Sequence, residues 1–210
     1  MLTIVIGNKN RSSWSMRPWL ALTKCGATFD EEIIRLDEPT TRAELERATP
    51  HGKVPVLRDG EAIVWESLAI CEHLAERFPS AQLWPTDVAT RARARSVATE
   101  MHAGFAALRR EMPCNVTLRS QKTPSADVAS DIARLTRLFR AERAAHASAG
   151  PYLFGSWSIA DAFFTPVATR FRSYGVSIDD EASRAYCATL LADPAFLAWE
   201  RGAIAENDPR

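Results

Sequence analysis

The sequence predicts a mixed α/β region followed by an all-helical region, and three observations carry this prediction. Apolar β-branched runs alternate with amphipathic segments over residues 1–80, whereas no convincing strand follows. The 210 residues are 46% hydrophobic and 25% charged, which is usual for a globular chain that buries its own core. The composition changes near a proline-containing stretch at residues 81–90, so we expect a linker there between domains at residues 1–80 and 91–210.

In the first region, apolar runs and amphipathic segments predict the order β-α-β-α-β-β-α. The expected strands are short runs rich in β-branched and apolar residues, at residues 2–6, 29–36, 54–57 and 62–65. Asp59 and Gly60 lie between the last two strands, and this dipeptide favours a hairpin turn. The expected helices cover residues 15–24, a short segment that opens at Thr41, and residues 67–78. Glu44, three residues after Thr41, predicts a capping box for the short helix.

The second region contains helical patterns separated by prolines and glycines. The helices are expected at residues 90–110, 126–146, 158–174, 181–192 and 194–205. Pro113 and Pro124 bracket a polar loop between the first two of them. Ser158 and Asp161 have the spacing of a capping box at the start of the third, which we interpret as a structural feature.

Charge, hydropathy and cysteine spacing argue against several classes of protein. The 26 basic and 26 acidic residues cancel, so we expect no nucleic-acid partner. No apolar run approaches the roughly 18–20 residues that span a bilayer, and the apolar N-terminal run is too short for a signal peptide. We therefore expect a cytoplasmic protein with no membrane segment. The four cysteines form no C-x-x-C pair, which predicts four buried free thiols and no metal site.

A polar loop at residues 8–15 follows the first predicted strand. Ligands of open α/β sheets collect at the carboxyl ends of strands and at helix N-termini, where free N–H groups favour anions. Ser12, Ser13 and Ser15 offer hydroxyls there to a bound anion or thiolate. Serine is also a common helix cap, so at least one of the three is expected to cap the helix.

Two further features mark the same region as a candidate site. Val54-Pro55 begins a predicted strand, where a cis bond would aim the backbone of Val54 at a peptide-like ligand; a trans proline on an edge strand is the alternative. Glu66 and Ser67 begin a helix, where the hydroxyl can donate to a carboxylate and the carboxylate can accept from an ammonium group. The alternative is a plain capping serine beside an exposed acid.

These features, in this order and spacing, resemble the cytosolic glutathione transferase family. The segment RSSWSMRPWLAL at residues 11–22 is similar to the family's serine-type active-site segment. Three other segments resemble its cis-proline turn, its Glu-Ser helix start and its helical-domain box: HGKVPVL at residues 51–57, WESLAI at residues 65–70 and SIADA at residues 158–162. The resemblance extends over nearly the whole chain.

The resemblance implies a thioredoxin-like domain followed by a helical bundle, in a homodimer that binds glutathione and a small electrophile and needs no metal. By position, Glu66 and Ser67 would hold the γ-glutamyl end of glutathione. Val54, next to Pro55, would pair its backbone with the cysteinyl part, and Lys53 would approach the glycyl carboxylate.

The resemblance leaves open which serine faces the sulfur. Ser12 lies five residues before Arg17, which is the spacing of the catalytic serine in zeta-like and tau-like classes, so it is the first choice; Ser13 and Ser15 are the alternatives. A hydroxyl that donates to the sulfur stabilises the thiolate, which is the nucleophile of a thiol with a free pKa of about 8.5. The thiolate would then attack the electrophile.

The electrophile itself is not specified by these motifs. Zeta-like members carry a cysteine where this chain has Trp14, which argues against maleylacetoacetate isomerase activity. Trp14, His102, Phe105 and Met112 are the candidates to line the electrophile pocket. The expected activity is conjugation or reduction of small electrophiles, with peroxidase activity as a side reaction. The alternatives are a non-catalytic binding protein of the same fold and a thiol-disulfide enzyme, for which the first loop lacks a cysteine.

Overall fold

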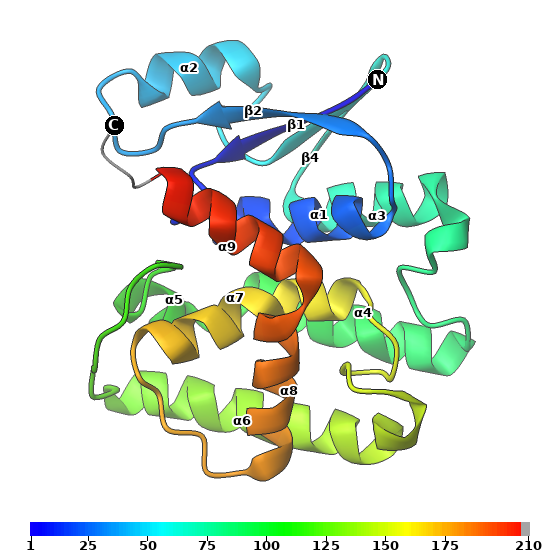
Figure 1. The fold of residues 1–210 in the computed structure, drawn as a ribbon, viewed down its shortest axis with the longest axis vertical. Coiled ribbons are helices and arrows are strands. Elements are labelled where there is room, and N and C mark those ends of the chain that lie inside the picture. The colour runs from blue at the N-terminus through cyan, green and yellow to red at the C-terminus, as the bar shows by residue number, and fades with distance from the viewer. Residues whose placement is uncertain (207–210) are drawn as a thin grey trace.

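The computed structural model describes residues 1–206 and contains a sheet layer packed on a layer of helices (Figure 1). The strands are β1 (Leu2–Gly7), β2 (Phe29–Ile34), β3 (Val56–Asp59) and β4 (Ala62–Trp65), in the sheet order β2-β1-β3-β4. β1 runs parallel to β2 and antiparallel to β3, and β3 and β4 form the predicted hairpin. Three helices accompany the sheet: α1 (Ser13–Lys24), α2 (Thr41–Ala48) and α3 (Ser67–Arg77). α2 covers one face, whereas α1 and α3 lie between the other face and the helical region.

The alternation of side chains along β1 explains why both faces of the sheet are covered. Ile4 and Ile6 point into the main hydrophobic core, which they share with α1, α3 and the helical region. Val5 points to the opposite face, where it forms a smaller cluster with Ile34 and Val56 under α2. The strand is therefore buried on both faces, as its unbroken β-branched run suggests.

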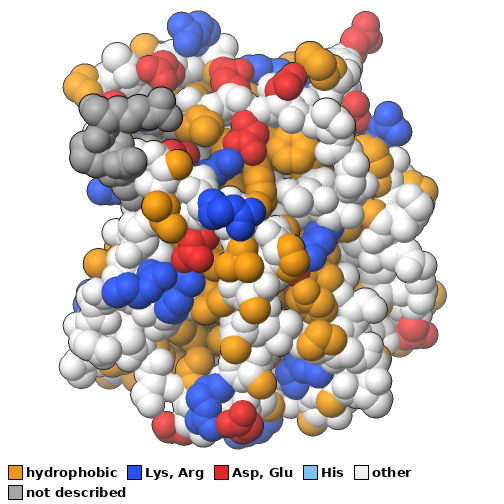
Figure 2. All heavy atoms as spheres, in the orientation of Figure 1, with side chains coloured by type: hydrophobic (Ala, Val, Ile, Leu, Met, Phe, Trp, Pro, Cys, Tyr) orange, Lys and Arg blue, Asp and Glu red, His pale blue; other side chains and the backbone are white. Residues whose placement is uncertain are grey.

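The second region is helical throughout, as the sequence predicts. Its helices are α4 (Val88–Ala103), α5 (Ala106–Glu111), α6 (Ala126–His146), α7 (Ile159–Ser173), α8 (Glu181–Ala192) and α9 (Pro194–Glu206). α7 is almost completely buried and packs against α1, α4 and α8. The capping box of Ser158 and Asp161 is confirmed at its N-terminus. Both signs of charge are mixed over the face in Figure 2, with apolar side chains between them.

Two sequence predictions about helices are wrong. The single helix expected at residues 90–110 is divided into α4 and α5, because Gly104 adopts an extended conformation and Phe105 a left-handed one, with φ 57°. A Cβ at Gly104 would lie 2.8 Å from the carbonyl oxygen of Glu100, so the close approach needs a glycine. The capping box expected at Thr41 and Glu44 is also absent: Thr41 Oγ1 instead donates to the carbonyl oxygen of Arg35, 2.6 Å away.

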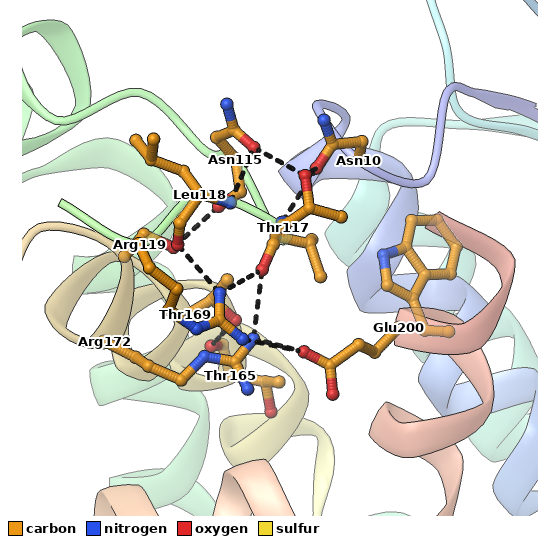
Figure 3. Close-up of polar contacts among 12 residues, drawn as sticks. Asn10, Asn115, Thr117, Leu118, Arg119, Thr165, Thr169, Arg172 and Glu200 are labelled. Carbon is orange, nitrogen blue, oxygen red and sulfur yellow. Dashed lines mark hydrogen bonds and ion pairs between the residues drawn. The ribbon is translucent and has the colours of Figure 1, made fainter. Parts of the chain in front are cut away.

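A polar network ties the loop after β1 to the helical region (Figure 3). Asn10 accepts hydrogen bonds from the backbone N–H groups of Val116, at its carbonyl oxygen, and Thr117, at Oδ1, both at 3.0 Å. Arg172 on α7 donates to the carbonyl oxygen of Val116 and pairs with Glu200 on α9 at 2.6 Å. The loop that carries the serines is therefore hydrogen-bonded to the helical region.

Residues 1–206 contain no helix that is both long and apolar enough to cross a membrane, and no cluster of His, Cys, Asp and Glu that suits a metal ion. All four cysteines are free; Cys71, Cys114 and Cys187 are buried as predicted, and Cys25 is half-buried. Burial raises the pKa of the Cys25 thiol to about 11 and that of Cys187 to about 12, so neither forms a thiolate near neutral pH.

Candidate functional site

A cavity of about 380 Å³ lies where the cis-proline turn, the start of α3 and the first turn of α1 face the end of α4. Its lining residues are Trp14, His51, Lys53, Val54, Pro55, Glu66, Ser67, His102, Ala103 and Arg109. All the residues predicted to bind glutathione are among them, and so are Trp14 and His102 of the residues considered for the electrophile pocket. They come from four separate segments of the chain, and the fold brings them together.

One half of the cavity is built by the turn before β3 and by the N-terminus of α3. The Val54–Pro55 peptide bond is cis. Glu66 precedes α3 with φ 68°, a left-handed conformation that is uncommon for a side chain of this size. Ser67, the first residue of α3, is 1% exposed, and its Oγ has no hydrogen-bond partner among the described residues. Unpartnered buried hydroxyls are unfavourable unless a ligand satisfies them, so this half is suited to a polar ligand.

The charges in this half suit a ligand with both signs of charge. The first N–H groups of α3 and the Ser67 hydroxyl can donate to a carboxylate. The Glu66 carboxylate is more than half exposed and can accept from an ammonium group. Lys53 is exposed, and the nearby His51 has a buried Nδ1 for which the described part of the chain offers no hydrogen-bond partner.

The other half of the cavity is aromatic and basic. Trp14 on α1 and His102 on α4 meet edge to face, with ring centroids 5.1 Å apart. His102 Nε2 lies 3.9 Å from Glu66 Oε2, whereas its Nδ1 is buried and has no hydrogen-bond partner within residues 1–206. Arg109 on α5 donates to the carbonyl oxygen of His102 and lies 5.4 Å from the Trp14 ring. Burial and the positive charge of Arg17 lower the pKa of His102, and Arg109 adds to this effect, although Glu66 opposes it.

The three predicted serines lie beside the cavity, and none of them is among its lining residues. Ser12 caps α1: its Oγ accepts from the Ser15 N–H and donates to Ser15 Oγ at 2.7 Å. Ser15 Oγ also accepts from the N–H of Gly7 at 3.1 Å. Ser13 Oγ accepts from Arg170 Nη2 at 3.3 Å. All three are more than nine-tenths buried, so each hydroxyl already has a partner inside the protein.

Sequence reasoning used Arg17 only for its spacing to Ser12 and gave it no role in the site. In the structure, Arg17 lies behind Trp14 in the cavity wall. Its side chain is fully buried, and none of its three nitrogens has a hydrogen-bond partner in the part of the chain that the structure describes. The guanidinium carbon lies 4.1 Å from the centroid of the Trp14 ring and 4.7 Å from that of Phe163. The available signal was a lone arginine, three residues after Trp14, in the otherwise apolar middle of a helix.

Four other residues also differ from sequence expectation. Arg109 and His51 line the cavity without having been singled out. Phe105 and Met112, considered for the electrophile pocket, belong to the buried core and do not line the cavity. The left-handed conformation of Phe105 turns its side chain into that core.

Comparisons with known proteins find related sequences and related folds. Residues 11–77 match the family model described as Glutathione S-transferase, N-terminal domain. A probable maleylacetoacetate isomerase of Caenorhabditis elegans is 32% identical over 95 residues, which are 45% of this chain and 44% of that protein. The match therefore spans less than half the length of this curated relative.

Two solved structures share the fold over nearly the whole chain. One is the holo structure of a maleyl pyruvate isomerase, described as a bacterial glutathione S-transferase in the zeta class; its TM-score is 0.75, with 22% identity over 96% of this chain and 97% of that one. The other is a glutathione transferase homologue from Burkholderia with bound glutathione, with a TM-score of 0.71 and 21% identity over 99% of both chains. The thioredoxin-like first region and the helical second region are thus those of known glutathione transferase structures.

Proposed function

We propose that the chain is a cytosolic glutathione transferase that binds glutathione in the cavity described above and presents the sulfur as a thiolate to a small electrophile. The proposal includes a cytoplasmic homodimer, as the family resemblance implies. It also retains the division into domains at residues 1–80 and 91–210.

The observation that carries the proposal is the unpartnered hydroxyl of Ser67 at the N-terminus of α3. We assign it, with the first N–H groups of the helix, to the α-carboxylate of the γ-glutamyl end. Glu66 then accepts from the ammonium group of the same residue. The backbone of Val54 pairs with the cysteinyl part, and Lys53 approaches the glycyl carboxylate. This placement directs the sulfur towards α1.

The serine-type mechanism assigns the sulfur to a hydroxyl at the start of α1. Ser12 is the first choice and Ser13 and Ser15 are the alternatives. To donate to the sulfur, Ser12 must turn its proton away from Ser15 Oγ, which costs one neutral hydrogen bond. A hydrogen bond to the thiolate is stronger, about 1.5–3 kcal/mol, and the helix dipole adds up to about 1 kcal/mol. Together they suffice to lower a thiol pKa by about 2 units, which requires about 2.7 kcal/mol.

The half of the cavity formed by Trp14, His102 and Arg109 would take the electrophile. Arg109 lies against the Trp14 ring, and the carboxylate nearest to His102 is that of Glu66, which the proposal assigns to glutathione. A flat apolar wall next to an arginine suits an unsaturated or halogenated electrophile that carries an anionic group. Conjugation is the main reaction proposed, and reduction of hydroperoxides is a side activity for the same thiolate.

A second candidate function is a non-catalytic binding protein of the same fold. A scaffold has no need for the buried, unpartnered groups of Ser67 and His102 beside one cavity, so these groups favour the enzyme. A thiol-disulfide enzyme is less well supported, because the described cysteines are buried or half-buried and burial raises the pKa of each thiol.

Retention on immobilised glutathione, followed by turnover of model electrophiles with and without a carboxylate, separates these functions. The proposal expects retention, elution by free glutathione, and turnover that is faster for the carboxylate-bearing electrophile. Retention without turnover of any electrophile or hydroperoxide would favour the binding protein. Absence of retention would contradict the glutathione site itself.

A further inference from the structure

Among the described residues, Arg17 stands out because burial of its unpaired charge is unfavourable and has no structural explanation. A guanidinium is always charged in water, and burying a charge without a partner is strongly unfavourable. Arg17 is 0% exposed, and its Nε, Nη1 and Nη2 all lack hydrogen-bond partners among residues 1–206. Arg170, the other deeply buried arginine, shows the contrast: it donates to the carbonyl oxygens of Met112 and Pro166 and to Ser13 Oγ. Arg170 therefore has a structural explanation that Arg17 lacks.

The groups around Arg17 do not neutralise it. The charged groups that act on it are Arg170 from α7 and Arg109 from α5, which are both positive. Cys71 on α3 and Cys114 after α5 are close as well, but burial raises the pKa of each thiol and keeps both neutral. Burial, with the positive charges of Arg170 and Arg109 adding to it, lowers the pKa of Arg17 to about 9. The guanidinium remains positive near neutral pH, in a region that is short of negative charge.

The position of Arg17 connects this charge to the cavity. Its guanidinium stacks on the Trp14 ring at 4.1 Å, and Trp14 lines the cavity. His102, which lies 5.1 Å from the same ring, has its pKa lowered in part by Arg17. The positive charge therefore lies one aromatic ring away from the space that a ligand occupies.

We propose that Arg17 is a positioning residue of this cavity: its buried, unpartnered guanidinium holds the Trp14 ring in the cavity wall and makes the cavity favour a negatively charged occupant, in particular the glutathione sulfur as an anion. The inference rests on the proposed function for the identity of that occupant. It assigns to Arg17 an electrostatic role alongside the serine hydrogen bond, with no direct contact to the sulfur required.

The expected size of the effect follows from Coulomb's law. Two unit charges about 10 Å apart, at an effective dielectric constant of about 20, interact strongly enough to move a pKa by about one unit. The bound thiol should therefore lose its proton about one pH unit lower with Arg17 present than without it. Below that pKa the thiolate fraction, and with it turnover, changes about tenfold.

The test compares Arg17→Met with Arg134→Met and the unchanged protein. Methionine keeps much of the volume and packs well on aromatic rings, but it removes the charge. Arg134 is a matched control because it pairs with Glu100 on α4 and neither residue lines the cavity. Two midpoints are measured: the thiolate absorbance of bound glutathione against pH, and the His102 imidazole titration by NMR without ligand. The His102 signal is assigned by its loss in His102→Gln.

In Arg17→Met, the thiolate midpoint should rise by about one pH unit and the His102 midpoint should rise too, while the melting temperature stays equal or increases. Replacing a buried unpaired charge by an apolar side chain is often neutral or stabilising. In Arg134→Met both midpoints should be unchanged. An unmoved thiolate midpoint would overturn the proposal, and so would a large loss of stability in Arg17→Met, which would reveal a structural role.

If the protein does not bind glutathione at all, the same measurements give a different pattern of results. If the unchanged protein shows no heat of glutathione binding, the glutathione assignment is wrong, and the His102 titration in the ligand-free protein then decides the role of Arg17. A rise of the His102 midpoint in Arg17→Met supports the proposal that the charge of Arg17 acts on the cavity. An unchanged midpoint overturns that proposal.

Discussion

The hydroxyls of Ser12 and Ser67 differ in their hydrogen bonding, although both residues lie at the start of a helix. Ser12 Oγ bonds to Ser15, whereas Ser67 Oγ is buried with no partner among the described residues. Sequence reasoning predicts a capping role for either, because serine is common at helix N-termini. It cannot show which hydroxyl is satisfied, because the partners come from segments such as Gly7 that only the fold brings close.

Replacing Ser12 by alanine should raise the apparent pKa of bound glutathione and slow turnover at neutral pH by ~10–100-fold, equivalent to ~1.4–2.7 kcal/mol of thiolate stabilisation. Affinity for glutathione should change much less, because both ends of the tripeptide stay bound. The thiolate absorbance against pH measures this directly. If Ser13→Ala or Ser15→Ala moves the titration and Ser12→Ala does not, a different hydroxyl faces the sulfur. If none of the three does, the serine-type assignment is wrong.

His102 should make the stability of the protein depend on pH. Its pKa is lowered in the folded state, first by burial and then by Arg17, so the unfolded chain binds a proton more readily. The contribution of neutral His102 is complete well above pH 6.5, the usual pKa of histidine, and is lost as the pH falls through that value towards the folded-state pKa. Urea unfolding from pH 8 to pH 5 should therefore show the native protein losing stability relative to His102→Gln. A constant difference between the two proteins would contradict this assignment.

At the scale of the elements, the sequence predicts the type and order of the helices and strands well, and their boundaries less well. Helices α6 and α8 occupy the predicted residues, because prolines, glycines or capping residues flank them clearly. The break between α4 and α5 was missed, because Gly104 within an alanine-rich helical pattern is tolerated as often as it ends a helix. That break places Ala103 and Arg109 in the cavity wall, so a boundary error here changes the candidate site.

Gly104→Ala should destabilise the protein by about 1–3 kcal/mol, because the new Cβ would lie 2.8 Å from the backbone oxygen of Glu100 and the chain must shift. The same shift should weaken binding of the electrophile more than binding of glutathione, since Arg109 follows the break. Thermal unfolding and the KM for each substrate measure these effects. Ser96→Ala, on the exposed side of the same helix, is the control. An equal melting temperature in Gly104→Ala and the control would show that the break does not require glycine.

At the scale of the whole molecule, the predicted fold class is confirmed, whereas the cavity depends on distances that no sequence pattern contains. The motifs at residues 11–22, 51–57 and 65–70 each predict one part of the site. His102 on α4 and Arg109 on α5 approach Trp14 and complete the cavity, although they lie far from these motifs in the sequence. The unpaired charge of Arg17 is visible only once its complete burial is known.

The protein is expected to be a homodimer. β4 is an edge strand of the sheet, and Ile63 and Trp65 on it are about half exposed, which is unusual for large apolar side chains on a free edge. A twofold contact is the commonest way to cover such a surface. Light scattering at micromolar concentration should give about twice the chain mass of 23.3 kDa, and Ile63→Lys should shift the protein towards the monomer. A mass near that of one chain for the unchanged protein would contradict the dimer.

Titration calorimetry of glutathione into the native protein, Ser67→Ala and the control Ser96→Ala tests the central assignment most directly. We expect the native protein and the control to bind glutathione with the same affinity. Ser67→Ala should bind more weakly by roughly 1–3 kcal/mol, because a buried carboxylate loses its donor. Equal affinities in all three proteins would contradict the placement of the γ-glutamyl end at α3, and the absence of binding to the native protein would contradict the glutathione site as a whole.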